Sequence, residues 1–119
     1  MKRKTICFFN SYKKWGGGEK WNYDMATRLA EKGYCVIAVT NWESELGQRL
    51  KKWGIKRYRI RISNISFFNL LKIYEIYRIL KRENITTIIL NLSIDLKLAG
   101  VAAKLAGTKK ILYARGMAK

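Results

Sequence analysis

Short apolar runs alternate along the chain with longer segments in which apolar residues recur every three or four positions. The first pattern is typical of buried β-strands, and the second is typical of amphipathic helices. Strands are predicted at residues 5–10, 35–40, 56–62, 87–92 and 110–114. Helices are predicted at residues 20–32, 45–53, 67–83 and 95–106. This regular alternation of strand and helix predicts an α/β fold.

The ends of the predicted helices carry recognisable signals. Each helix is followed by a residue that readily adopts the left-handed backbone conformation closing a helix. These residues are Gly33, Gly54, Asn84 and Gly107. Serines near three of the helix starts are candidate N-caps, which accept hydrogen bonds from the first turn. They are Ser44, Ser66 and Ser93.

The predicted order favours a three-layer, Rossmann-like domain with a five-stranded parallel sheet between two layers of helices. Right-handed crossovers favour the strand order 3-2-1-4-5. The third strand alternates arginine with apolar residues, which gives it one polar face and places it at a sheet edge. Its arginines are Arg57, Arg59 and Arg61. At 119 residues, the chain is expected to form one domain, residues 1–119.

A glycine-rich segment follows the first predicted strand. Gly16, Gly17 and Gly18 are succeeded by Glu19 and Lys20, where the first helix is expected to begin. Glycines allow a ligand to approach the backbone closely, and a helix N-terminus attracts negative charge. The segment therefore predicts a phosphate-binding loop, with a flexible turn into the helix as the alternative.

Other candidate site residues follow the strands at the expected ligand-binding edge. In open parallel sheets, ligands bind beyond the carboxyl ends of the strands, where the strand order reverses. Here that point lies between the first and fourth strands, with the fifth alongside. The candidates for a cleft are Asn10, Asn91, Asp95, Arg115 and Gly116. Asp95 also suits the first turn of a helix, and Arg115 is the strongest candidate for an anion contact.

The charge of the chain indicates anionic partners. Lys and Arg total 25 and Asp and Glu total 8, which gives a net charge of +17. Such a field attracts nucleic acid, anionic membranes or phosphorylated ligands, although a genome rich in A and T would also raise the lysine content. A basic patch for an anionic membrane or another anion is expected at five residues. They are Lys51, Lys52, Arg57, Arg59 and Arg61.

The remaining composition narrows the chemistry. The chain has no histidine and two cysteines, Cys7 and Cys35, whose spacing fits no metal motif. We expect buried free thiols, no metal and no cofactor. Apolar runs are too short to span a bilayer. A cytoplasmic protein is therefore expected, with the inner face of the cell membrane as a peripheral location.

The segment from Gly16 to Lys20, together with the run at residues 25–36, resembles the opening of family 4 glycosyltransferases. Those enzymes begin with a strand, a Gly-Gly-x-Glu-Lys-type loop and a helix ending in a Leu-Ala-x-x-Gly-His-x-Val pattern. Tyr34 takes the histidine position here. Residues 91–100 and 109–116 resemble a branch of the family that acts on lipopolysaccharide or related surface glycans.

The resemblance implies a GT-B architecture, in which two Rossmann-like domains enclose the active site. The chain would be most of the N-terminal, acceptor-side domain, with the C-terminal donor-binding domain absent from it. The intact enzyme would be a retaining transferase that moves a sugar from a sugar nucleotide to a lipid-linked or polysaccharide acceptor. The resemblance places Gly16, Gly17 and Gly18 against the donor diphosphate and Arg115 in the cleft, and it implies no metal.

On this interpretation, the 119-residue chain is expected to be inactive alone. The alternative is a non-enzymatic basic α/β module that binds nucleic acid. It is less favoured because the chain carries no recognised nucleic-acid-binding motif and its basic residues are spread over several elements.

Overall fold

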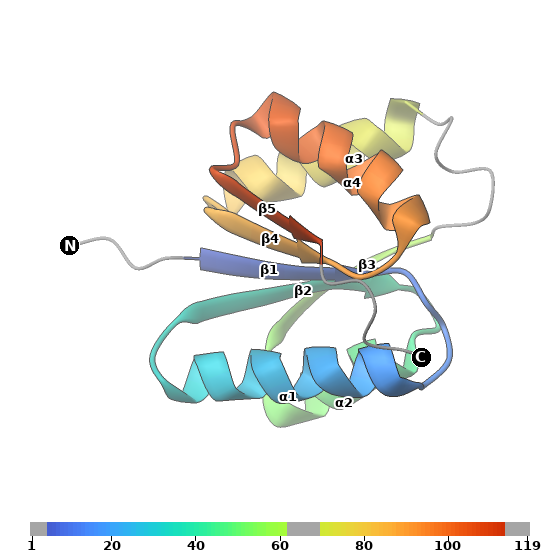
Figure 1. Cartoon of the computed structure of the whole chain (residues 1–119), viewed down its shortest axis with the longest axis vertical. Helices are drawn as coiled ribbons and strands as arrows, with labels where there is room; N and C mark the ends of the chain where they lie inside the picture. The colour runs from blue at the N-terminus through green and yellow to red at the C-terminus, as the bar shows by residue number, and fades with distance from the viewer. Residues whose placement is uncertain (1–4, 62–69, 114–119) are drawn as a thin grey trace.

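The computed structural model describes residues 5–61 and 70–113, in which strands and helices alternate strictly. The strands are β1 (Thr5–Asn10), β2 (Cys35–Asn41), β3 (Lys56–Ile60), β4 (Thr87–Leu90) and β5 (Lys110–Tyr113). The helices are α1 (Gly17–Glu31), α2 (Glu45–Trp53), α3 (Leu70–Arg82) and α4 (Ser93–Ala106). Figure 1 shows the sheet between a layer of α1 and α2 and a layer of α3 and α4.

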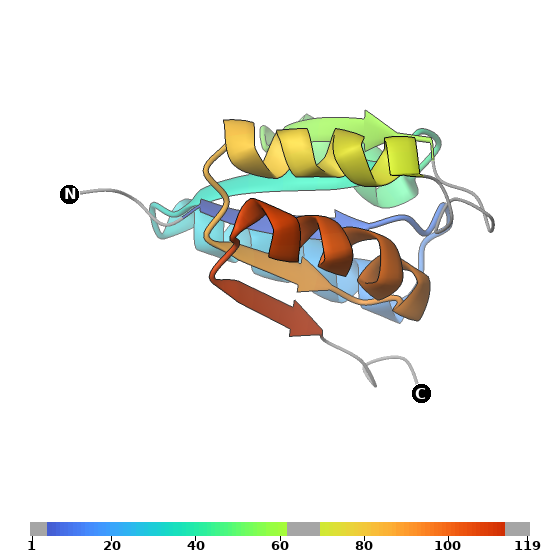
Figure 2. The ribbon, with the colours of Figure 1, turned by 90° about the horizontal axis from the view of Figure 1, so that it is seen from above.

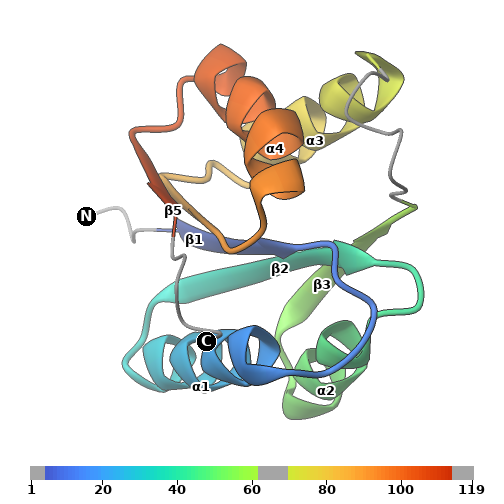
Figure 3. The ribbon, with the colours of Figure 1, turned by 45° about the vertical axis from the view of Figure 1, so that its right-hand side comes forward.

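All five strands of the sheet are parallel, and their order is β3-β2-β1-β4-β5. This confirms the predicted three-layer fold and its strand order. The order reverses between β1 and β4, so the strands on either side of β1 lead to helices on opposite faces of the sheet. The carboxyl ends of β1, β2 and β4 consequently meet at one edge, beside the start of α1 (Figure 3).

The apolar residues of β1 divide between two cores. Phe8 packs under α1 and α2, whereas Cys7 and Phe9 pack under α3 and α4, and all three are fully buried. Alternate residues of β2 and β4 enter the same two cores. A strand buried on both faces has to be apolar throughout, which explains its uninterrupted sequence pattern. Cys7 and Cys35 are both free thiols, and Cys35 is only half-buried.

The edge strand β3 has one apolar and one basic side, as its alternation predicted. Tyr58 and Ile60 contribute to the core under α3 and α4. Arg57 lies on the opposite side, where its Cδ is 3.1 Å from the place that a Cβ on Gly47 of α2 would occupy. The alternation therefore reports correctly which side chains of β3 enter the core.

The predicted helix C-termini are confirmed by the backbone. The four predicted terminators have positive φ angles of 98°, 111°, 57° and 77°, which L-residues with bulky side chains avoid. In chain order they are Gly33, Gly54, Asn84 and Gly107. Ser44 caps α2, because its Oγ accepts a hydrogen bond of 2.9 Å from the Gly47 N–H.

The prediction for Ser93 was wrong, since the N-cap of α4 is Leu92 and provides no side-chain cap. Helix α1 begins at Gly17 rather than residue 20, because the Lys20 N–H already donates to the Gly16 carbonyl at 3.0 Å. Strand β4 ends at Leu90 because α4 begins three residues later. Ser66 and the predicted ends at residues 62, 67 and 114 lie outside the described residues.

Gly47 is predicted to be a packing requirement of the α2–β2 contact. An added Cβ would lie 2.4 Å from the Oγ1 of buried Thr40. Gly47→Ala should lower the free energy of unfolding by about 1–3 kcal/mol, because overpacking outweighs the better helix propensity of alanine.

The matched control for this substitution is Gly17→Ala. A Cβ on Gly17 meets no atom within 4 Å, so this variant should be as stable as the parent or slightly more stable. Urea unfolding of the three proteins provides the measurement. Equal stability of the two variants would contradict the proposed contact.

Candidate functional site

A group of buried polar side chains gathers at the carboxyl ends of β1 and β2 and at the starts of α1 and α4. Its members are Asn10, Ser11, Glu19, Asn22, Asn41 and Asp95. Buried polar groups cost free energy unless they are hydrogen-bonded, so such a concentration needs specific partners. The structure supplies most of them between elements that are distant in sequence, although Oδ1 of Asn22 has no hydrogen-bond partner among the described residues.

Ser11, the first residue after β1, is held by two other elements. Its backbone N–H and its Oγ–H donate to the carboxylate of Asp95 at 2.9 Å and 2.6 Å. Its carbonyl accepts a hydrogen bond of 3.0 Å from Nδ2 of Asn41. The exit of β1 is thereby fixed to the first turn of α4 and to the end of β2.

Asn10 and Glu19 connect the end of β1 to the first turn of α1. The Asn10 Nδ2 donates to Oε2 of Glu19 at 3.1 Å, and its Oδ1 accepts from the Tyr12 N–H at 2.9 Å. Glu19 is only 4 % exposed, so its carboxylate braces the loop from inside and does not face solvent.

A second contact joins α1 to the end of β4. The Nδ2 of Asn22 donates both to the Gly18 carbonyl, at 2.8 Å, and to Oδ1 of Asn91, at 2.5 Å. Asn22 occupies a buried position of α1 between Glu19 and Ala26. Because these positions are three and four residues apart, the sheet-facing side of α1 is polar at its start and apolar further along.

The glycines form the exposed start of α1. Gly16 is the N-cap, in an extended conformation and without a side-chain cap, and Gly17 and Gly18 belong to the first helical turn. Apart from the adjacent residues and the helix's own backbone, no atom of the described residues lies within 4 Å of a Cβ built on Gly17 or Gly18. None of these three glycines has a positive φ angle. What Gly17 and Gly18 provide is a helix start without side chains of its own, where an added Cβ would meet no other described element.

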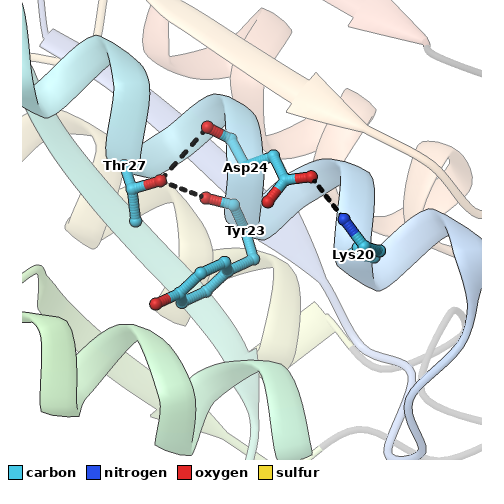
Figure 4. A network of polar contacts seen from close by, with 4 residues as sticks. All are labelled: Lys20, Tyr23, Asp24 and Thr27. Atoms are coloured by element: carbon cyan, nitrogen blue, oxygen red, sulfur yellow. Dashed lines mark hydrogen bonds and ion pairs between the residues drawn. The ribbon is translucent and has the colours of Figure 1, made fainter.

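Lys20 lies at the same helix start but is paired along the helix. Figure 4 shows its ammonium group directed at Asp24, one turn away, and the two are 3.0 Å apart. Exposed pairs of this kind contribute only about 0.3–0.5 kcal/mol, so they give way readily to a stronger partner. Thr27, in the same view, donates to the Tyr23 and Asp24 carbonyls at 2.9 Å and 3.2 Å.

The structure brings many of the predicted site residues to one edge of the sheet. Asn10, Asn91 and Asp95 lie there together with the glycine segment. Asp95 is fully buried in the first turn of α4 and accepts two hydrogen bonds from Ser11, while its role as a cleft residue stays a prediction. Arg115 and Gly116 lie outside the described residues.

Sequence reasoning missed Ser11, Asn22 and Asn41. All three are polar residues at positions that the fold buries, and all three form hydrogen bonds in the network. The available signal was polarity at the sheet-facing positions of the first helix and at the ends of the first two strands. That signal becomes visible only when the strand order is known.

The five residues of the predicted basic patch all lie on α2 or at the β3 edge, but they do not form a single cluster. Lys51 and Lys52 are exposed in the last turn of α2, whereas Arg57 is half-buried. The guanidinium carbons of Arg59 and Arg61 lie 4.5 Å and 5.3 Å from the ring centre of Trp42, which follows β2. The two arginines therefore gather near the carboxyl edge of the sheet, and the lysines lie toward its other end.

No family model and no curated relative matches the sequence. Solved structures do match the fold. MurG from Acinetobacter baumannii has a TM-score of 0.74 at 18% identity, over 94% of this chain and 35% of that chain. A glycosyltransferase from Rickettsia africae has a TM-score of 0.79 at 19% identity, over 95% of this chain and 30% of that chain.

The C-terminal domain of a hydrogenase from Pyrococcus furiosus is also similar, with a TM-score of 0.67 at 16% identity, over 96% of this chain and 94% of that domain. The chain shares the Rossmann-like fold of all three proteins. At these identities the likeness concerns the fold alone. The chain spans about a third of the length of the two glycosyltransferases that it matches.

Asp95 is predicted to make stability depend on pH. Burial raises the pKa of its carboxyl from 3.8 to about 6, and the charge of Glu19 adds to this, while the hydrogen bonds from Ser11 act in the opposite direction. The folded chain thus binds the proton more tightly than the unfolded chain. The free energy of unfolding should fall as the pH rises from about 4 to 7, by on the order of 1–3 kcal/mol.

Asp95→Asn should abolish this contribution while keeping the shape of the side chain. Asp95→Ala should destabilise at every pH by about 1–3 kcal/mol, since the Ser11 N–H loses its acceptor. Thermal unfolding between pH 4 and pH 8 compares the three proteins. If the curves of the parent and Asp95→Asn run parallel, Asp95 does not titrate in this range.

Proposed function

We propose that this chain is the acceptor-side, N-terminal part of a retaining glycosyltransferase with GT-B architecture. The intact enzyme transfers a sugar from a sugar nucleotide to a lipid-linked or polysaccharide acceptor, such as a lipopolysaccharide or related surface glycan. The observation that carries the proposal is the uncovered glycine start of α1 at the point where the strand order reverses. Two of the structures with this fold are glycosyltransferases.

The start of α1 offers suitable chemistry for a diphosphate. The first N–H groups of a helix have no partner within the helix, and the helix dipole adds about 0.3–1 kcal/mol for a negative charge there. Gly17 and Gly18 leave space for phosphate oxygens to approach these groups. Lys20 supplies a positive charge after release from Asp24. In sugar transfer these groups stabilise the charge of the departing phosphate, without a metal or another cofactor.

The polar network below the glycines supports this role by fixing their position. Glu19 ties the first turn of α1 to β1, and Asn22 ties it to the end of β4. A binding site held by rigid elements loses little conformational entropy when the ligand arrives. These residues bind and orient the donor, and the groups that break the bond belong to the donor-side domain.

Gly17→Val is predicted to weaken donor binding without unfolding the chain. The side chain enters open space in the free protein and crowds the position assigned to the diphosphate. In the protein expressed from its complete reading frame, we expect at least a tenfold rise in the donor Kd, since charged hydrogen bonds contribute about 1.5–3 kcal/mol each. Isothermal titration with sugar nucleotides measures it, and the melting temperature serves as the folding control.

Gly17→Ala is the graded variant and should weaken binding less. The 119-residue chain alone should show no transfer with a panel of sugar nucleotides and lipid acceptors. Unchanged donor affinity in Gly17→Val would leave the glycines as a turn only. If the 119-residue chain alone transfers sugar at the rate of an intact enzyme, the proposal that a separate donor-side domain supplies the bond-breaking groups is wrong.

The location that we propose for the enzyme is the inner face of the cell membrane, where a lipid-linked acceptor is found. None of the helices within residues 5–61 and 70–113 has both the length and the apolar character needed to cross a bilayer. Lysines and arginines near an anionic surface each add about 1 kcal/mol of attraction. Arg59 and Arg61 are exposed and gather near Trp42, which suits a peripheral contact, and the exposed Lys51 and Lys52 of α2 add to the overall attraction.

Arg59→Glu/Arg61→Glu is predicted to reduce binding to anionic vesicles. Arg57 is left unchanged because it packs beside Gly47. Lys109→Glu/Lys110→Glu is the matched control, since both lysines are exposed and the change in net charge is the same. Co-sedimentation with vesicles of phosphatidylglycerol and phosphatidylcholine, at low and high salt, measures binding.

We expect the arginine variant to lose most of its binding and the lysine variant to lose less. Equal losses would mean that only the total charge matters, and the β3 edge would not be the docking face. If the parent ignores vesicles and binds duplex DNA or structured RNA at physiological salt, the nucleic-acid alternative is favoured.

A further inference from the structure

A pocket of about 230 Å³ opens between the edge strand β3 and helix α3. Figure 2 shows α3 lying alongside β3 at this edge of the sheet. The pocket is lined by Tyr58, Arg59, Glu75, Arg78, Ile79 and Arg82. It belongs to the α3 and α4 side of the sheet, whereas the glycine segment begins a helix on the other side.

Positive charge predominates around this pocket. Arg78 and Arg82 are exposed and lie one helical turn apart, and neither forms an ion pair with another described residue. The nearby carboxylates have other hydrogen-bonding or ion-pair partners, although Arg82 also lies close enough to Glu83 for the two charges to interact. Glu75 pairs with Lys72 at 3.5 Å, and Glu83 accepts hydrogen bonds from Lys56, at 2.6 Å, and from the Tyr58 hydroxyl.

The spacing of the two arginines brings two like charges close together at the pocket. Like charges four residues apart on a helix repel one another, and an anion placed between them offsets that repulsion. Guanidinium groups bind phosphate oxygens through paired hydrogen bonds, with a geometry that lysine does not reproduce. The guanidinium carbon of Arg78 lies 5.9 Å from the centre of the Tyr74 ring, so an aromatic neighbour favours its position at the rim.

The floor of the pocket is less polar than its rim. Ile79 is buried, and the half-buried ring of Tyr58 packs against the α3 and α4 core. Arg59 lines the edge, although its guanidinium group rests over Trp42. A phosphate between Arg78 and Arg82 would place the group attached to it against this apolar floor.

We propose that this pocket binds the phosphate of a small phosphate ester or of a phospholipid headgroup. The site is separate from the glycine segment and does not depend on the proposed transferase activity. Recognition comes from the arginine pair, which binds the phosphate, and from Tyr58 and Ile79, which contact the attached group.

The test compares the 119-residue chain with Arg78→Gln/Arg82→Gln. The control is Arg28→Gln/Lys32→Gln, which removes the same charge from exposed positions at the end of α1. Binding of glycerol phosphate is measured by ³¹P NMR titration at constant ionic strength. We expect the arginine variant to bind at least about tenfold more weakly, and the control variant to bind like the parent.

A second arm uses vesicles of phosphatidylcholine with and without phosphatidic acid, to separate a lipid headgroup from a soluble ester. Arg78→Lys/Arg82→Lys keeps the charge and removes the paired geometry, and it should bind glycerol phosphate more weakly than the parent. Loss of binding in both arms that is confined to the arginine variants supports the pocket, as does loss in either arm alone. Equal losses in the control, or no binding by the parent in either arm, would overturn it. Circular dichroism verifies folding of each variant.

Discussion

The structure of the candidate site depends on the hydrogen bonds that fix the two residues after β1. Asn10 and Ser11 are buried, and each is bound by a side chain from another element. Such groups cost more when unpaired than they contribute when paired, so the network specifies one arrangement. It aligns β1, β2, α1 and α4 at a common edge. That alignment fixes the position of the glycine residues at the start of α1.

The glycine segment differs in local conformation from the sequence prediction, and its role as a phosphate-binding site stays a prediction. Sequence reasoning expected a glycine-rich loop before a helix at residue 20. Instead, Gly17 and Gly18 are helical, and their contribution is the absence of side chains over the first turn. Both conformations expose backbone N–H groups at a helix start. Either conformation is therefore compatible with the predicted anion site.

The fold was largely predictable because its signals are local. The residues that end the helices, the apolar strands and the alternation in β3 each depend on neighbours within a few positions, and right-handed crossovers supply the strand order. The polar network was only partly predictable. Ser11 and Asp95 are 84 residues apart in sequence, and nothing near either one indicates the other. Asn22 resembles any polar helix residue until the sheet beside it is known.

The effect of the chain's positive charge on anion binding depends on where the basic residues lie. A net charge of +17 by itself attracts any polyanion. The structure separates cations that already have a partner, such as Lys20 and Lys56, from arginines that stack on aromatic rings or stand one turn apart on α3. Long-range attraction depends on the total charge and weakens with salt. Discrimination between different anions depends on the arginines, because paired arginines impose a geometry on the bound anion that a diffuse positive field lacks.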